Sequence, residues 1–150
     1  SLRATVGTNR WNTGGTHYNL ERNITHPNYV ASVIKNDLGF LVTRTNIVFN
    51  NVVQPAVLNY DFANAGVRTR RLAQQLNVRG VPPVEPHIEI CTFHSLNHGT
   101  CNGDSGSALV RAGTNQQVGV VSWGLPCARG APDMFVRVSA FRAWIESVIR

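Results

Sequence analysis

The feature that most limits the fold of this chain is a recurring series of short β-rich runs separated by turn residues. The runs are SLRATVG, THYNLERNI, LGFLVT, SALVRA, QQVGVVSW and DMFVRVS, and stretches such as NTGG, HPNY and AGTNQ lie between them. Runs of this length and composition are typical of β-strands, and the Gly, Pro and Asn residues between them are typical of tight connections. The sequence therefore predicts an all-β fold, either an antiparallel barrel or a sandwich.

Two segments depart from this pattern. Near the C-terminus, apolar side chains recur at helical spacing, so residues 140–150 are expected to form an amphipathic helix that docks on the core. The apolar residues of this helix are Phe141, Trp144, Ile145, Val148 and Ile149. The second segment, residues 63–86, contains a cluster of arginines, a short stretch LAQQL that would suit a helix, and a proline-rich exit.

The charge pattern argues against a nucleic-acid partner. The net charge is +6, but the arginines are scattered apart from Arg68, Arg70 and Arg71, and no aromatic residues interleave with them. Lys35 is the only lysine among 14 basic residues. Arginine keeps its charge in alkaline surroundings, although a compositional habit of the lineage would give the same pattern.

No segment of the sequence suggests a membrane partner. No stretch approaches the roughly 20 apolar residues that cross a bilayer, and the opening SLRATVGTNR lacks the apolar core of a signal peptide. We therefore expect a soluble chain whose export signal lies upstream. Asn23-Ile24-Thr25 is a glycosylation sequon that would suit secretion, although such triplets also occur by chance.

The strongest chemical signal is the segment Cys101-Asn102-Gly103-Asp104-Ser105-Gly106-Ser107, which precedes an apolar run. A serine becomes a nucleophile when a tight turn holds its hydroxyl beside a base and backbone N–H groups point at the developing oxyanion. Gly103 would let its N–H pair with that of Ser105, and Asp104 would need a buried cationic partner. The same four residues GDSG would also suit an ordinary glycine-rich loop.

Two further motifs accompany this segment. Val120-Val121-Ser122-Trp123-Gly124 follows it, and Asn36-Asp37-Leu38-Gly39 lies well upstream. With all three motifs the chain resembles the chymotrypsin family of serine proteases, in particular the chymotrypsin- and collagenase-like digestive enzymes of insects and especially of Lepidoptera. The G-x-S-x-G signature of α/β-hydrolases fails at Ser107, which argues against that alternative.

The resemblance implies an antiparallel double β-barrel of the chymotrypsin type, here incomplete, with a C-terminal helix. Residues 1–62 would form part of the first barrel, 63–86 an irregular junction where family segments are missing, and 87–150 part of the second barrel with the helix. We expect the second barrel to be nearly complete and the first to be open.

The resemblance also assigns the catalytic residues. Ser105 would be the nucleophile, Asp37 the buried carboxylate that orients a catalytic histidine, and Gly103 with Ser105 the oxyanion hole. The family motif that supplies the histidine is absent from this chain. His17 and His26 precede Asp37, but both fall at positions that are not catalytic in relatives, and surface or structural roles are expected for His87, His94 and His98.

Substrate contacts carry over in the same way. The strand through Trp123 would pair with the substrate backbone. Trypsin-like enzymes have Asp where Gly99 stands, so strict Arg/Lys preference is not expected, and Asp133 would place negative charge on another wall of the pocket unless it is simply a solvated loop carboxylate. We expect chymotrypsin-like or broad specificity. The expected substrate-binding residues are Gly99, Thr100, Asn102, Ser122, Trp123, Gly124 and Asp133.

Three cysteines are an odd number for a secreted protein, in which cysteines usually pair in disulfides. Neither a C-x-x-C motif nor Cys/His zinc spacing occurs, so no metal and no cofactor is expected. By the resemblance, Cys101 and Cys127 form a disulfide that braces the pocket loops, and the partner of Cys91 is missing.

Two functions follow from these observations. The first is that of a secreted, monomeric digestive endopeptidase of the gut lumen, of which this sequence would be an incomplete part. Its partners would be protein or peptide substrates and proteinaceous inhibitors. The second is an inactive serine-protease homologue that binds or regulates, because the catalytic histidine is absent from the chain.

Overall fold

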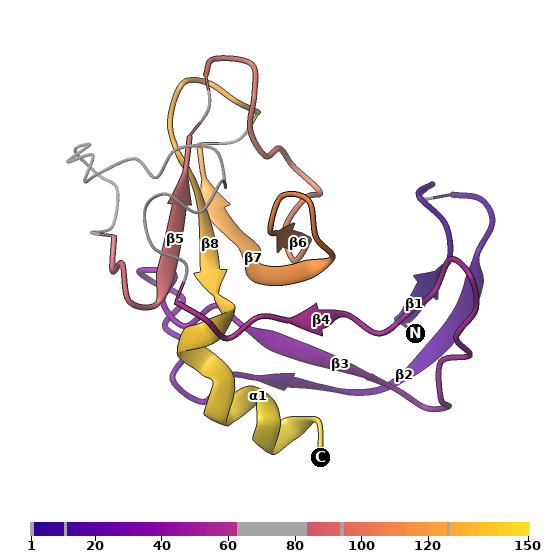
Figure 1. The fold of residues 1–150 in the computed structure, drawn as a ribbon. Coiled ribbons are helices and arrows are strands. Elements are labelled where there is room, and N and C mark those ends of the chain that lie inside the picture. Colours follow the sequence, from indigo (N-terminus) through magenta and orange to yellow (C-terminus); the bar gives the residue numbers. More distant parts are fainter. Residues whose placement is uncertain (1, 11, 63–83, 94, 126) are drawn as a thin grey trace.

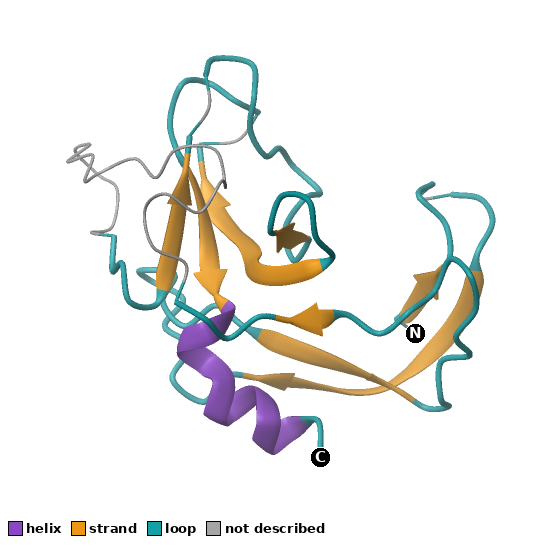
Figure 2. Ribbon diagram, in the orientation of Figure 1, coloured by secondary structure: helices purple, strands orange, loops and turns teal. Residues whose placement is uncertain are grey.

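The computed structural model describes residues 2–10, 12–62, 84–93, 95–125 and 127–150. Within these ranges the chain forms two β-sheets and a short C-terminal helix (Figure 1). Strands and connecting loops account for most of the traced chain, as Figure 2 shows. The all-β prediction is confirmed, and no helix among the described residues is long and apolar enough to cross a membrane.

The first sheet has the antiparallel order β1-β2-β3. Its strands are β1 (Arg3–Val6), β2 (Thr16–Thr25) and β3 (Gly39–Thr43), and β2 runs along both neighbours. The turn from β1 to β2 requires glycine at position 15, because φ is +75° and a Cβ there would lie 2.6 Å from the carbonyl oxygen of Val6. Only three strands form this half of the molecule in the described residues.

The second sheet has the order β4-β7-β8-β5, and β6 pairs with β7 beside it. Its strands are β4 (Val57–Leu58), β5 (Glu89–Thr92), β6 (Ala108–Val110), β7 (Gln116–Gly124) and β8 (Asp133–Arg137). The sequence pattern missed β4 and β5. It missed β4 because that strand has only two residues. β4 pairs in parallel with β7, although β4 comes from the 1–62 segment that was expected to form the first barrel. The domain limits drawn from the sequence stay a prediction.

Strand β8 is the centre of the core, because it lies between β7 and β5 and all five of its residues are buried. Its apolar residues join two clusters. One packs Phe135 against Ile90 and Val118, and the other fills the space between the sheets and the C-terminal helix. The second cluster consists of Val136, Val138, Phe141 and Ile145, with Leu38, Phe40, Leu58, Tyr60, Ile88, Val120 and Trp144 around it.

The C-terminal helix is confirmed but is shorter than predicted. A 3₁₀ turn, Val138–Phe141, leads into α1 (Arg142–Val148). The expected apolar face docks through Phe141 and Ile145, whereas Ile149 lies past the helix end and is exposed. The ring of His26 makes edge contacts with the rings of Phe141 and Trp144, at centroid distances of 5.0 and 4.8 Å.

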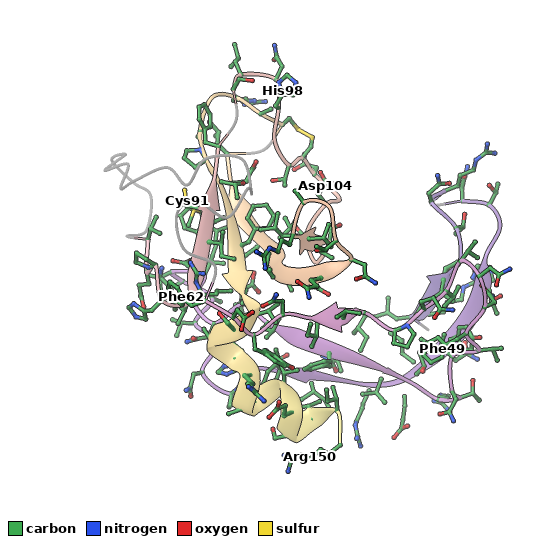
Figure 3. The ribbon with its side chains drawn as sticks, viewed as in Figure 1. Phe49, Phe62, Cys91, His98, Asp104 and Arg150 are labelled. Atoms are coloured by element: carbon green, nitrogen blue, oxygen red, sulfur yellow. A yellow bond between two sulfur atoms is a disulfide. The ribbon has the colours of Figure 1, made fainter. Side chains whose placement is uncertain are left out.

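The first half of the molecule leaves apolar side chains uncovered in the described structure. Leu41 on β3 and the loop residues Val48, Phe49 and Val52 are all more than half exposed. Figure 3 shows Phe49 at the end of the first sheet that lies far from α1. The openness expected for the first barrel is consistent with this exposure. The LAQQL stretch predicted as a possible helix lies outside the described residues.

Candidate active site

The loop that carries Ser105 is built from two consecutive turns. The N–H of Asp104 donates to the carbonyl oxygen of Cys101 at 3.1 Å, and the N–H of Ser107 donates to that of Asp104 at 3.0 Å. Gly103 and Gly106 adopt φ of +97° and +84°, a region that other residues enter only with strain. These two glycines let the chain reverse tightly on each side of Ser105, whose side chain is exposed at the surface of the loop.

Two backbone donors on this loop are available to a ligand. Within the described part of the chain, the N–H groups of Gly103 and Ser105 have no backbone acceptor, whereas the N–H of Gly106 donates to Val121 at 2.9 Å. Asp104, for which a buried cationic partner was expected, is exposed in this structure. Asp104 lies exposed on the loop that leads into β6 (Figure 3), and its Oδ2 accepts from the N–H of Cys101 at 2.8 Å.

Asp37 and Ser122 meet although 85 residues separate them. The hydroxyl of Ser122 donates to Oδ2 of Asp37 at 2.6 Å. Ser122 is the extra residue of a β-bulge, because Val121 pairs with Phe135 and Trp123 with Met134. A bulge re-aims the side chain that it carries. The bulge in β7 is therefore the local feature that directs the Ser122 hydroxyl to a carboxylate on the neighbouring loop.

Asp37 and Ser105 line the same cavity, which has a volume of about 700 Å³ and lies between the two sheets. Apolar side chains of both sheets and of α1 form most of its remaining wall. Its lining contains no histidine among the described residues. The cavity thus joins the predicted nucleophile to the predicted carboxylate. The other lining residues are Leu38, Gly39, Phe40, Leu41, Ala56, Leu58, Gly106, Gln117, Val120, Val121, Val138, Ile145 and Ile149.

Each described histidine contacts other groups. Nδ1 of His17 lies 2.8 Å from the Thr5 hydroxyl, and His26 packs on α1, where its Nδ1 accepts from the N–H of Asn28 and burial lowers its pKa. His87 lies 3.7 Å from Glu85, and His98 lies 3.0 Å from the Ser95 hydroxyl near the tip of the loop between β5 and β6 (Figure 3). His94 lies outside the described residues.

The predicted pocket residues come together around Asp133. The Thr100 N–H donates to Oδ2 of Asp133 at 3.0 Å and the Thr100 hydroxyl donates to Oδ1 at 2.6 Å. A Cβ on Gly99 would lie 2.8 Å from Oδ2, and one on Gly124 would lie 3.5 Å from Oδ1. Asp133 is only 6% exposed. The alternative that it is a solvated loop carboxylate is therefore wrong.

The strand expected to pair with a substrate has one open edge. Trp123 and Gly124 pair with β8 on one side, whereas the pairing of β6 along the opposite edge ends at Val120. Beyond Val121, that edge of β7 has no strand partner in the described ranges. An extended peptide would find unpaired backbone groups there.

The disulfide between Cys101 and Cys127 is confirmed. The N–H of Cys127 also donates to the carbonyl oxygen of Thr100 at 2.8 Å, so the bridge ties the loop of Ser105 to the loop that precedes β8. Asn102 is exposed in the turn after Cys101. Cys91 is buried in β5.

Sequence reasoning missed one group of residues near the site. Glu89 accepts a hydrogen bond from the indole N–H of Trp123 at 3.0 Å and one from the ammonium of Lys35 at 2.7 Å. The available signal was that Lys35 is the only lysine and lies two residues before Asp37.

Comparison with known proteins gives concordant matches. The trypsin family matches residues 1–145. Chymotrypsin-2 of Vespa crabro is 30% identical over 86% of this chain and 69% of its own length, and the protein named trypsin, alkaline B, of Manduca sexta is 32% identical over 93% of this chain and 69% of its own length. The second alignment spans 181 positions, more than the 150 residues of this chain, so that relative has residues inside the aligned region that this chain lacks.

A solved structure described as HL collagenase shares the fold. Its TM-score is 0.77, at 23% sequence identity, over 98% of this chain and 75% of that one. The two curled sheets and the C-terminal helix therefore correspond to an incomplete double β-barrel of the chymotrypsin type.

Proposed function

This chain belongs to the trypsin family of serine proteases, and from that premise we propose that Ser105 is the nucleophile of a secreted endopeptidase that cleaves peptide bonds through an acyl-enzyme. The observation that carries the proposal is the cavity shared by Ser105 and Asp37, together with the hydrogen bond that fixes Asp37 to Ser122. Segments that are far apart in the sequence converge there.

The chemistry divides among three groups. The Ser105 oxygen would attack the scissile carbonyl carbon, and the N–H groups of Gly103 and Ser105 would stabilise the negative charge that develops on the carbonyl oxygen. The proton of Ser105 would go to an imidazole, which Asp37 would hold in the required tautomer. Because Ser122 donates to Oδ2 of Asp37, Oδ1 is the oxygen left to accept from that imidazole.

The position of the histidines favours a second candidate function. The four described histidines contact other groups, and none lines the cavity between Asp37 and Ser105. Without a base the hydroxyl of Ser105 stays a poor nucleophile, and loss of the base lowers the rate by several orders of magnitude. The second candidate is therefore a non-catalytic homologue that binds partners through the same surface.

We propose chymotrypsin-like or broad specificity. Gly99 puts no carboxylate of its own in the pocket and packs closely against Asp133, because a Cβ there would lie 2.8 Å from Oδ2. The disulfide ties the loop of Gly99 to the loop that precedes Asp133. Both oxygens of Asp133 already accept hydrogen bonds from Thr100, which weakens the attraction of the carboxylate for a basic side chain. An extended substrate would add to the open edge of β7 at Ser122-Trp123-Gly124, and the turn of Asn102 would border the pocket.

A digestive role in the gut lumen, action as a monomer and binding of proteinaceous inhibitors complete the proposal. Support comes from the relatives in Manduca sexta and Vespa crabro, which are named as a trypsin and a chymotrypsin. Inhibitors that present an extended loop would use the same open strand edge as a substrate.

The test is to purify the protein from its source, determine its intact mass and N-terminal sequence, and treat it with a fluorophosphonate that labels activated serines. We expect covalent label on the peptide that contains Ser105 and cleavage of a mixed peptide library, with both lost in Ser105→Ala. A protein of the mass of this chain that neither takes the label nor cleaves peptides would refute the protease and establish the non-catalytic homologue.

A further inference from the structure

A buried ion pair lies beside the Asp37 loop and is not explained by the reaction itself. Lys35 is the only lysine of the chain and is 7% exposed. Its ammonium lies 2.7 Å from Oε2 of Glu89, which is 6% exposed. Charged side chains are seldom buried to this degree unless a structure satisfies them fully. The burial of this pair therefore indicates that the fold holds the Lys35 and Glu89 side chains in one defined geometry.

The backbone on either side of Lys35 is also held in a defined conformation. Ile34 and Asn36 both have positive φ, at 50° and 55°. This conformation is unfavourable for a β-branched residue such as isoleucine, and it persists only where surrounding contacts hold it. The contacts include the bond of the Asn36 side chain to the carbonyl oxygen of Asn28, at 2.8 Å, the bond of Lys35 to Glu89, and the backbone pairing of Lys35 with Val30. The loop that presents Asp37 is thus held by both side-chain and backbone bonds.

Glu89 connects this loop to the predicted substrate strand. Oε2 of Glu89 accepts from Lys35 and from the N–H of Glu85 at 2.8 Å, and Oε1 accepts from the indole N–H of Trp123 at 3.0 Å. One carboxylate therefore joins the residue two positions before Asp37 to the residue after Ser122. Asp37 and Ser122 are themselves in contact. Two adjacent connections, one direct and one through Glu89, cross from the same loop to the same strand.

Further charged groups lie around the pair. The buried guanidinium of Arg137 donates to the carbonyl oxygen of Glu89 at 3.1 Å, and burial lowers the pKa of Arg137. Glu85, which is partly exposed, lies 3.7 Å from the ammonium of Lys35. Two cations and two carboxylates thus share the site. Because each of the Glu89 oxygens has a donor in a defined direction, the side chain has one arrangement that satisfies all its partners.

We propose that Lys35, Glu89 and Trp123 form a positioning network that sets the Asp37 loop and the substrate-binding strand in register with each other. Lys35 and Glu89 are positioning residues, since they act through Asp37 and Ser122, and Trp123 is the strand residue that they hold. The catalytic meaning of the network rests on the proposed protease function. The coupling of loop to strand is a property of the folded chain and holds whether or not the chain is a working enzyme.

The test uses the full chain and measures no catalysis. In Lys35→Met, Glu89 loses its cation, and we expect amide hydrogen exchange at residues 36–38 and 121–124 to accelerate at least tenfold more than in the rest of the described chain. The indole N–H resonance of Trp123, assigned by its loss in Trp123→Phe, should shift. Lys35→Arg should restore both signals. Glu146→Gln, which breaks the exposed pair between Arg142 and Glu146, is the matched control and should change neither.

A uniform acceleration of exchange along the chain would show a purely structural pair and would overturn the proposal, as would unchanged exchange at residues 36–38. Should Lys35→Met not fold, Trp123→Phe decides the matter, because it keeps the ion pair and removes a single hydrogen bond. Faster exchange at residues 36–38 in that variant supports the network, and unchanged exchange refutes it. Fluorophosphonate labelling at Ser105 tests the protease function independently of these measurements.

Discussion

Replacing Asp133 with Ala removes the acceptor of both hydrogen bonds that hold Thr100 in the pocket wall. The carboxylate is 6% exposed, and its two oxygens accept from the Thr100 N–H at 3.0 Å and from the Thr100 hydroxyl at 2.6 Å. After the substitution both Thr100 donors face a space without an acceptor. The expected result is a large loss of stability together with a rearranged pocket loop.

The magnitude follows from the number of bonds. A hydrogen bond to a charged group contributes about 1.5–3 kcal/mol, so loss of both should lower the free energy of unfolding by about 3–6 kcal/mol. Asp133→Asn keeps one carbonyl acceptor for the Thr100 N–H, and its amide nitrogen can donate to the Thr100 hydroxyl. That variant should cost only about 1–2 kcal/mol. The difference between the two variants isolates hydrogen bonding from side-chain volume.

Urea unfolding followed by circular dichroism measures these differences. With a slope of about 2 kcal/mol per molar urea, Asp133→Ala should lower the midpoint by about 1.5–3 M. Asp61→Asn, at an exposed aspartate, is the control and should shift the free energy by less than about 0.5 kcal/mol. Equal midpoints for Asp133→Ala and the control would refute the inference that Asp133 organises the pocket.

Three further predictions concern the site and its supports. Ser122→Ala removes the hydroxyl that holds Asp37 and should cost about 1–2 kcal/mol in urea unfolding, and an unchanged midpoint would mean that the hydrogen bond contributes nothing. Reduction of the disulfide between Cys101 and Cys127, which are 26 residues apart, should lower stability by about 3 kcal/mol, measured as the midpoint with and without reductant; an equal midpoint contradicts it. Burial lowers the pKa of His26 from 6.5, so the unfolded chain binds its proton first. The stability that His26 contributes is complete above about pH 6.5 and is lost as the pH falls through the lower folded pKa. His26→Gln should flatten this part of the stability profile, and a slope unchanged in that variant would exclude His26 as its source.

The sequence predicted most of the strands because their patterns are local. The runs around β2, β3, β7 and β8 lie where the β-rich runs were expected, and the apolar spacing before the C-terminus marked α1. β4 was missed because two residues show no periodicity. Its pairing with β7 depends on a neighbour that lies far along the chain, and local pattern holds no information of that kind.

The candidate site residues were proposed from local motifs, but their contacts with one another could not be predicted in that way. The glycines on either side of Ser105 indicate a tight turn at the level of sequence. The motif around Asp104 does not show that this residue is exposed, because whether a carboxylate is buried depends on what else packs around the loop. Glu89 was missed because its partners, Lys35 and Trp123, lie 54 and 34 residues away.

By itself, then, the sequence determined the all-β class, the helix at the end and the turn that carries Ser105, since these depend on residue type and short-range spacing. The tertiary structure alone decided that Ser122 reaches Asp37, that Asp133 is buried against Thr100 and that one carboxylate joins the Asp37 loop to β7. The physical reason is that hydrogen bonds and burial act over a few ångströms in space. Only the folded chain brings residues that are far apart in sequence within that distance.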